Sequence, residues 1–223
     1  MAQKKYVATG SSFISTGAEN TFTLGDLSAT GWNWEADELR ILDAATANAT
    51  SSMFYLTVAE AVDMVGNGAP AGWYDGDGNC YNDTVLDLGQ GFMTRLISDV
   101  TFTSAGQVYG DAFSAAYKGA TENKKYNMIP NPLPKTIKLG SISAQGWNWE
   151  ADELRVLDPQ TANPTSSMFY LTAAEAVDMV GNGAPAGWYD GDGNCYNDTD
   201  VEVGSGFMSR FVSDVILVFP SAL

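Results

Sequence analysis

Apolar and polar residues alternate over short stretches of this chain, and Gly, Asn and Asp separate the stretches. A two-residue period is typical of β-strands, because successive side chains point to opposite faces of a sheet. The pattern predicts strands over 21–24, 38–42, 52–56, 84–88 and 92–102. The last stretch is apolar on both faces, which indicates that a second layer covers it. Many short strands separated by turn residues favour a β-sandwich or a barrel, and we expect a sandwich.

One stretch has the pattern of a helix instead. Thr57 and Glu60 stand at the spacing of a capping box, in which the threonine hydroxyl accepts from the Glu60 amide and the glutamate reaches back. Apolar residues follow on one helical face and a glycine ends the pattern: Val58, Ala61, Val62, Val65 and Gly66. We therefore expect a short helix of about two turns.

Residues 31–84 recur almost unchanged at 146–199. The two copies match at 49 of 54 positions, with an offset of 115 residues. Within 223 residues, this repetition predicts two tandem, near-identical β-sandwich-like domains, each with one short helix. We expect a first β module at 1–110 with an N-terminal arm at 1–20, a linker at 111–121 and a second β module at 122–223.

The chain has a formal net charge of −16 and contains no histidine. This charge repels the phosphates of nucleic acids, and no apolar run is long enough to span a bilayer. The lack of histidine removes the commonest general base and the usual ligand of transition metals, and neither a phosphate loop nor a serine elbow is present. We expect no enzyme, no nucleic-acid partner and no membrane insertion.

Lysine is absent from two acidic segments of the chain, 21–108 and 139–223, here called the acidic bodies. Residues 21–108 hold twelve acidic side chains against Arg40 and Arg95, and residues 139–223 hold twelve against Arg155 and Arg210. The lysines lie outside, in the arm and the connector: Lys4, Lys5, Lys118, Lys124, Lys125, Lys135 and Lys138. This separation indicates either pairing with the acidic bodies, within the molecule or between subunits, or lysines that simply solvate loops.

The most specific motif is an acidic loop that occurs once in each copy. It places oxygen-bearing side chains, and one backbone carbonyl, at alternate positions, which suits Ca²⁺ because this cation takes about six to eight oxygen ligands. The candidate ligands are Asp75, Asp77, Asn79, Tyr81 and Asp83, with the counterparts Asp190, Asp192, Asn194, Tyr196 and Asp198.

The start of this loop resembles the Asp-x-Asp-x-Asn register of EF-hand-like calcium loops, which implies Ca²⁺ ligation by Asp75, Asp77 and Asn79. Cys80 stands where those loops have glycine, and Leu86 where they have the bidentate glutamate, so the resemblance covers only the first part of the motif. The alternative is a polar hairpin turn, in which Asp, Asn and Gly are favoured for their backbone geometry. The sequence predicts one or the other.

Cys80 and Cys195 are equivalent residues, one in each copy, so neither has a partner within its own module. A bond between the modules, a bond between subunits and two free thiols are the alternatives, and the first requires Cα atoms within about 7 Å. Free thiols are favoured, because a lone cysteine usually behaves as a small buried hydrophobe.

Six tryptophans have two interpretations. They are flat platforms for sugar rings, or they supply buried area to small β domains, which is the commoner use. The residues are Trp32, Trp34 and Trp73, with Trp147, Trp149 and Trp188.

Each copy also has three neighbouring carboxylates, at Glu35, Asp37 and Glu38 and at Glu150, Asp152 and Glu153. Glycosidases use a pair of carboxylates, but no cleft-forming insertion accompanies these. We expect a solvated face that braces nearby arginines, and no catalytic residues.

The stretch 215–219 is apolar on both faces, and we expect another subunit to cover it. With the duplication and the lack of catalytic residues, this predicts a secreted structural protein located outside the cell or on a bacterial surface. It would be the subunit of a self-assembling filament or surface layer, joined to copies of itself by exchange of a strand or of the N-terminal arm. The alternative is a calcium-dependent tandem carbohydrate-binding protein, with glycans as partners.

Overall fold

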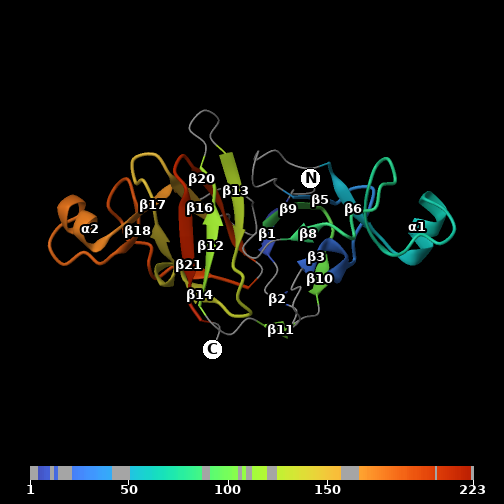
Figure 1. Cartoon of the computed structure of the whole chain (residues 1–223), viewed down its shortest axis with the longest axis horizontal. Coiled ribbons are helices and arrows are strands. Elements are labelled where there is room, and N and C mark those ends of the chain that lie inside the picture. Colours follow the sequence, from blue (N-terminus) through green and yellow to red (C-terminus); the bar gives the residue numbers. More distant parts are fainter. Residues whose placement is uncertain are drawn as a thin grey trace.

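A computed structural model describes residues 5–10, 13–14, 22–41, 51–86, 91–104, 107–108, 112–119, 125–156, 166–203 and 205–221. The protein is mainly β, with two short helices and several antiparallel sheets (Figure 1), which confirms the expected fold class. None of the helices in these ranges has the length and apolar character that crossing a membrane requires.

Each half of the chain contains one five-stranded antiparallel sheet, and the two sheets have the same strand order. The first runs β1 (Lys5–Gly10), β9 (Gly91–Leu96), β5 (Glu38–Ile41), β6 (Met53–Leu56) and β7 (Gly72–Asp75). The second runs β13 (Lys125–Pro130), β20 (Gly206–Phe211), β16 (Glu153–Val156), β17 (Met168–Leu171) and β18 (Gly187–Asp190). The repeated sequence therefore forms the same sheet twice, while the division into domains stays a prediction.

Smaller sheets accompany the two large ones. One pairs β4 (Leu27–Thr30) with β10 (Thr101–Ser104), and another places β21 (Val215–Phe219) between β12 (Phe113–Tyr117) and β15 (Ser143–Gln145). Two-residue pairs complete the set: β3 (Phe22–Thr23) with β8 (Val85–Leu86), β14 (Ile137–Lys138) with β19 (Asp200–Val201), and β2 (Phe13–Ile14) with β11 (Gln107–Val108). Short 3-10 turns, Leu24–Asp26 and Leu139–Ser141, follow β3 and β14.

The apolar cores lie between the large sheets and the smaller ones. In the first half, Leu39, Met53 and Phe92 of the large sheet pack with Leu27 and Ala29 of β4. The second core has the same layout and also takes up buried side chains of β12 and β21. This two-layer arrangement is what strands with an apolar inner face require.

The helices cap the two far ends of the molecule. Helix α1 (Val58–Met64) lies at one end and α2 (Ala173–Met179) at the other (Figure 1). The capping box is present: the Thr57 hydroxyl accepts from the Glu60 amide at 3.4 Å, and the Thr57 amide donates to the Glu60 carboxylate at 2.8 Å. Gly66, with φ of +129°, follows the last turn. The sequence prediction of this helix is confirmed.

The two halves meet along their first strands. Strand β1 contacts β13 and β20, and Met93, Met128 and Met208 form an apolar cluster at this junction. The approach is close, because a Cβ on Gly91 would stand 2.7 Å from the carbonyl oxygen of Met128. A thioether side chain adapts well to such irregular gaps.

Both ends of the chain make contacts within the chain. In the N-terminal arm, β1 pairs with β9 over its whole length. The terminal strand β21 has an exposed outer face, where Ile216 is 39% exposed, so cover of that face by another subunit stays a prediction; its inner face, with Val215, Leu217 and Phe219, is covered by the chain's own core. Residues 113–117, inside the expected linker, form β12 and supply part of this cover.

A buried aspartate explains why the expected strand 92–102 is divided into β9 and β10. Asp37 is 2% exposed, and its carboxylate accepts backbone N–H bonds from Asn33 (2.9 Å), Ile97 (2.6 Å) and Ser98 (3.2 Å). These bonds hold the chain in a turn between the strands. Asp152 makes the same bonds to Asn148, Val212 and Ser213.

We predict that Asp152→Ala lowers the free energy of unfolding by about 2–4 kcal/mol, because it leaves three backbone donors without their charged acceptor. Urea denaturation followed by tryptophan fluorescence measures this. Glu150→Ala, which removes an exposed carboxylate from the same turn, is the matched control. Equal losses in the two variants would contradict the role given to Asp152.

Candidate functional site

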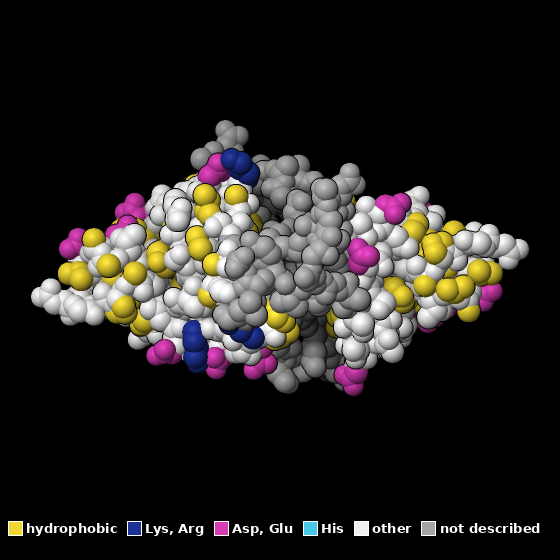
Figure 2. All heavy atoms as spheres, turned by 60° about the horizontal axis from the view of Figure 1, so that its bottom comes forward, with side chains coloured by type: hydrophobic (Ala, Val, Ile, Leu, Met, Phe, Trp, Pro, Cys, Tyr) yellow, Lys and Arg dark blue, Asp and Glu magenta, His cyan; other side chains and the backbone are white. Residues whose placement is uncertain are grey.

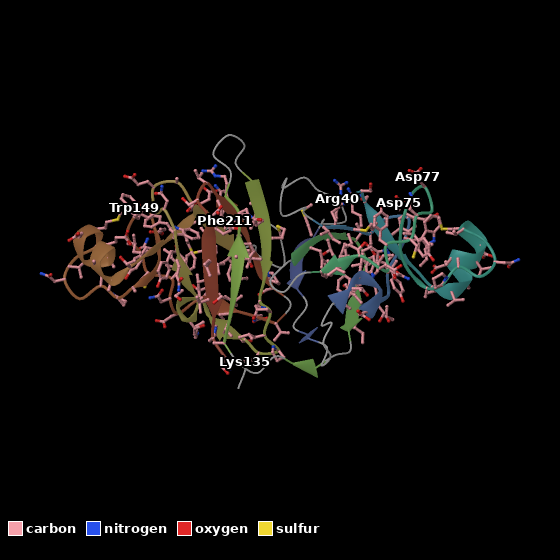
Figure 3. All side chains as sticks on the ribbon, viewed as in Figure 1. Arg40, Asp75, Asp77, Lys135, Trp149 and Phe211 are labelled. Atoms are coloured by element: carbon pink, nitrogen blue, oxygen red, sulfur yellow. The ribbon has the colours of Figure 1, made fainter. Side chains whose placement is uncertain are left out.

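The acidic loop begins at the last residue of β7, near the α1 end (Figure 3). Asp75 is 6% exposed, and its carboxylate accepts from the amides of Asp77 (3.0 Å) and Asn79 (2.9 Å). The Asn79 side-chain amide (2.9 Å) and the Tyr81 hydroxyl (3.0 Å) donate to its other oxygen. Asp190 makes the equivalent bonds in the second copy. The side chain thus holds the turn together.

These hydrogen bonds determine which oxygen atoms of the loop are free to bind a cation. Both oxygens of Asp75 are already used, whereas Asp77, Asn79 and Asp83 are exposed. Within the described ranges, no group of three or more His, Cys, Asp or Glu side chains is arranged to hold a metal ion. Calcium binding stays a prediction, and bound Ca²⁺ would have to replace the donors that now occupy Asp75.

Asn82 covers the outer edge of β7, a role that sequence reasoning missed. Its side-chain oxygen accepts from the Trp73 amide at 2.9 Å, and its Nδ2 donates to the Ala71 carbonyl at 3.0 Å. A Cβ at Gly72 would stand 1.9 Å from that oxygen, so only glycine fits opposite it. The side chain closes this edge together with the backbone of 79–81, where the Tyr81 amide donates to the Trp73 carbonyl at 2.8 Å. Asn197 does the same for β18.

Two of the six tryptophans are excluded as sugar platforms. Trp73 and Trp188 are 0% exposed, and their indole N–H groups donate to the carbonyls of Leu27 (2.7 Å) and Ile142 (2.9 Å). A ring without exposed surface cannot stack on a ligand. The other four are half-buried: Trp32 and Trp147 pack edge-on against the buried pair, and Trp34 and Trp149 pack against Phe54 and Phe169. Core packing accounts for these contacts.

Both cysteines are free thiols in this chain, and both are exposed. Cys80 lies beside Tyr74, whose hydroxyl donates to the Pro70 carbonyl at 2.7 Å. Burial, together with the contact to Cys80, raises the pKa of Tyr74 to about 12. The thiols are accessible to a second molecule, so a bond between subunits stays open as an alternative.

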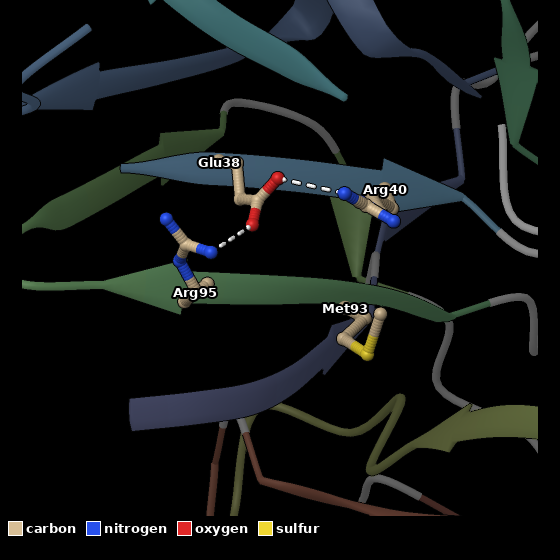
Figure 4. A pocket seen from close by; sticks show the side chains of 4 residues that line it. All are labelled: Glu38, Arg40, Met93 and Arg95. Carbon is tan, nitrogen blue, oxygen red and sulfur yellow. Dashed lines mark hydrogen bonds and ion pairs between the residues drawn. The ribbon is translucent and has the colours of Figure 1, made fainter. Parts of the chain in front are cut away.

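The four arginines of the chain form two Glu-centred clusters on the faces of the large sheets that point away from their cores. Glu38 lies between Arg40 (3.0 Å) and Arg95 (2.9 Å), beside a hollow of about 160 Å³ that Met93 also lines (Figure 4). Burial acts to raise the pKa of Glu38, but hydrogen bonds from Ser52 and Arg40 and the two positive charges hold it below its usual range. In the second cluster, Glu153 pairs with Arg155 (2.9 Å) and with Arg210 (3.5 Å).

The neighbouring carboxylates thus have different roles. Glu38 and Glu153 brace arginines, as expected, and Glu35 and Glu150 are exposed. Asp37 and Asp152 do not belong to a solvated face, because each is buried against backbone amides. Sequence spacing did not distinguish them, since the amides that they bind lie about sixty residues further along the chain.

Two connector lysines pair within the molecule. Lys118 lies 2.6 Å from Asp214, and Lys138 lies 2.8 Å from Asp200. The side chains of Lys4, Lys5, Lys124 and Lys125 lie outside the described part. The interpretation that lysines pair with the acidic bodies holds for these two, within one chain.

Comparison with known proteins adds no relative: no family model, no curated protein and no solved structure matches this chain.

The acidic turn should make stability depend on pH. Hydrogen bonds from Asn79 lower the pKa of Asp75 below its ordinary value, and those from Asn194 do the same for Asp190. A carboxyl with a lowered folded-state pKa contributes stability that is present above its ordinary pKa of about 4 and is lost as the pH falls through the folded-state pKa.

Asp75→Asn with Asp190→Asn should therefore lower the free energy of unfolding near neutral pH and flatten its decline toward about pH 3. Urea titrations across this range measure both effects. Asp83→Asn with Asp198→Asn, at exposed positions of the same loops, should keep the parental profile. If the Asp75/Asp190 variant showed the parental dependence of unfolding free energy on pH, these two carboxylates would be excluded as the cause of that dependence.

Calcium binding is tested best at Asp77 and Asp192, because their side chains are exposed and the turn does not depend on them. If the loops bind Ca²⁺, the cation should raise the melting temperature, and Asp77→Ala with Asp192→Ala should abolish the rise while leaving the melting temperature in EDTA unchanged. Differential scanning calorimetry measures both. The absence of any rise in the parent protein would rule out the calcium site.

Proposed function

We propose that this chain is a non-enzymatic structural protein outside the cell, which assembles end to end with copies of itself into a filament or surface layer. The observation that carries the proposal is the position of its exposed apolar side chains. Ten large hydrophobic residues are exposed in the described part, and six of them lie on α1, α2 or the residue that ends each helix. They are Val58, Met64 and Val65, with Val177, Met179 and Val180.

These side chains gather at the two far ends of the molecule. The helices lie at opposite ends (Figure 1), and hydrophobic atoms appear at both ends in the space-filling view (Figure 2). Beside α2, a hollow of about 140 Å³ opens between Met179, Val180 and the acidic loop. Exposed apolar groups on a soluble protein often mark contact sites.

A molecule with similar apolar surfaces at its two ends can join copies of itself into a linear polymer. If like ends meet, each contact is self-complementary, and the second end of each subunit remains available to continue the chain. If α1 meets α2, the contact is head to tail and also propagates. In both cases the apolar contact has to overcome the repulsion between chains of net charge −16. Salt should therefore promote assembly.

The contacts within the chain favour a joint between subunits at the helix ends over the exchange of an arm or strand that the sequence suggested. Exchange of the N-terminal arm would require β1 to leave β9, and Asn82 and Asn197 close the outer edges of the large sheets. The helix ends need no such rearrangement. Carbohydrate binding has less support, because Trp73 and Trp188 are buried.

The test compares two pairs of exposed valines. Val65→Glu with Val180→Glu puts a charge on each helix end, and Val85→Glu with Val203→Glu adds the same charge at exposed positions away from the helices. Light scattering and negative-stain microscopy, with Ca²⁺ and with EDTA, should show linear assemblies for the parent and the Val85/Val203 variant. The Val65/Val180 variant should remain a single particle with an unchanged circular dichroism spectrum.

Val65→Glu alone distinguishes the two geometries, since contact between like ends predicts dimers through α2, and head-to-tail contact predicts monomers. A parent protein that stays a single particle at every concentration and salt level would refute the proposal.

A further inference from the structure

The two halves differ at the strands beside β10 and β21, and among the described residues this difference leaves an edge of β10 open. Strand β21 pairs with β15 on one side and with β12 on the other. Its counterpart in the first half, β10, pairs with β4, and among the described residues no strand lies along its other edge. Figure 1 shows β12 beside β21.

The missing neighbour has a measurable effect on burial. Val215 and Leu217 of β21 are 1% and 0% exposed, whereas their counterparts Val100 and Phe102 are only half-buried. In the second half, Ala115 of β12 is buried opposite Leu217, and the Tyr117 ring packs 5.6 Å from Phe211, which is labelled in Figure 3. Among the described residues of the first half, no side chains take the place of Ala115 and Tyr117 in this layer.

The position of β12 along the chain explains the difference. Strands β1 and β13 are equivalent, because Lys5 pairs with Leu96 as Lys125 pairs with Phe211. β12 comes shortly before β13, so its counterpart would come shortly before β1. The segment that joins the halves therefore completes the second half, and the described residues of the first half contain no equivalent strand.

Charge identifies what kind of strand fits. At the end of β12, Lys118 pairs with Asp214 at 2.6 Å, and the Gly119 amide donates to the same carboxylate at 3.0 Å. The counterpart of Asp214 is Asp99, which is exposed and has no ion pair with any described residue. Asp99 beside the open edge is therefore available to a lysine that follows an added strand, as Lys118 follows β12.

We propose that the open edge of β10 accepts an antiparallel strand from another molecule carrying this repeat, with the sequence character of 113–119. The donor presents a small residue and then an aromatic one toward the core, as Ala115 and Tyr117 do, and ends in Lys-Gly at Asp99. Backbone hydrogen bonds supply affinity, while the small residue opposite Phe102 and the lysine at Asp99 supply register. The inference stands independently of the helix ends, because it concerns a single acceptor and a single strand.

A synthetic peptide of residues 112–119 tests the acceptor on the whole chain. It should bind saturably with one site per chain by isothermal titration calorimetry, and it should slow hydrogen exchange at the amides of 100–104. Ala115→Pro in the peptide removes a ladder donor and should abolish binding. Protection over 215–219 instead would mean that the peptide displaces β12, and it would overturn the proposal, as would the absence of binding.

Charge reversal tests the register. Lys118→Glu in the peptide should weaken binding about threefold to tenfold, and Asp99→Lys in the protein should restore it for that peptide only. Asp83→Lys, which makes the same charge change at another exposed position in the first half, should not restore it. Equal effects of Asp99→Lys and Asp83→Lys would show a general charge effect and contradict the assigned site.

A fusion provides the second measurement. Placing a copy of residues 111–124 ahead of residue 1 should fill the edge from within, raise the melting temperature and abolish peptide binding. A fusion protein that still binds the peptide with parental affinity would overturn the proposal, whatever the helix ends do in solution.

Discussion

The architecture of each half depends on one buried carboxylate that binds backbone amides. Asp37 and Asp152 join the turn before β5 or β16 to the turn after β9 or β20. A buried charge is costly unless donors surround it, and here three N–H groups do so. These hydrogen bonds fix a turn after β9 or β20. The chain therefore leaves the large sheet at this turn and enters the smaller sheet. The two-layer core follows from that change of sheet.

Some surface groups have their hydrogen-bond partners within the chain, and others are free to contact another molecule. Asn82 and Asn197 occupy the outer edges of the large sheets, and Asp75 and Asp190 hold the acidic turns with their own donors. Two features remain without partners in the described part: the apolar ends of the helices and the outer edge of β10. Both are chemically suited to contacts between chains, one through apolar area and the other through backbone hydrogen bonds.

Local features could be predicted from the sequence and distant ones could not. The capping box of Thr57 and Glu60 involves neighbours, and the helix appeared where expected. The role of Asp37 depends on amides about sixty residues away, which no spacing reveals. Residues 114–121 looked like a linker because most of them are small or polar, yet 114–117 pair with β21 through their backbone. For the acidic loop, the sequence left a turn and a calcium site as alternatives; the hydrogen bonds around Asp75 form a turn, and calcium binding stays a prediction.

The junction between the halves makes their fit sensitive to oxidants. Met128 is 5% exposed and packs with Met93 and Met208 where β9, β13 and β20 meet. Conversion of a thioether to a sulfoxide introduces a polar oxygen into such a contact. Oxidation of these sulfurs would weaken the contact between the two sheets, and methionine sulfoxide reduction would restore it.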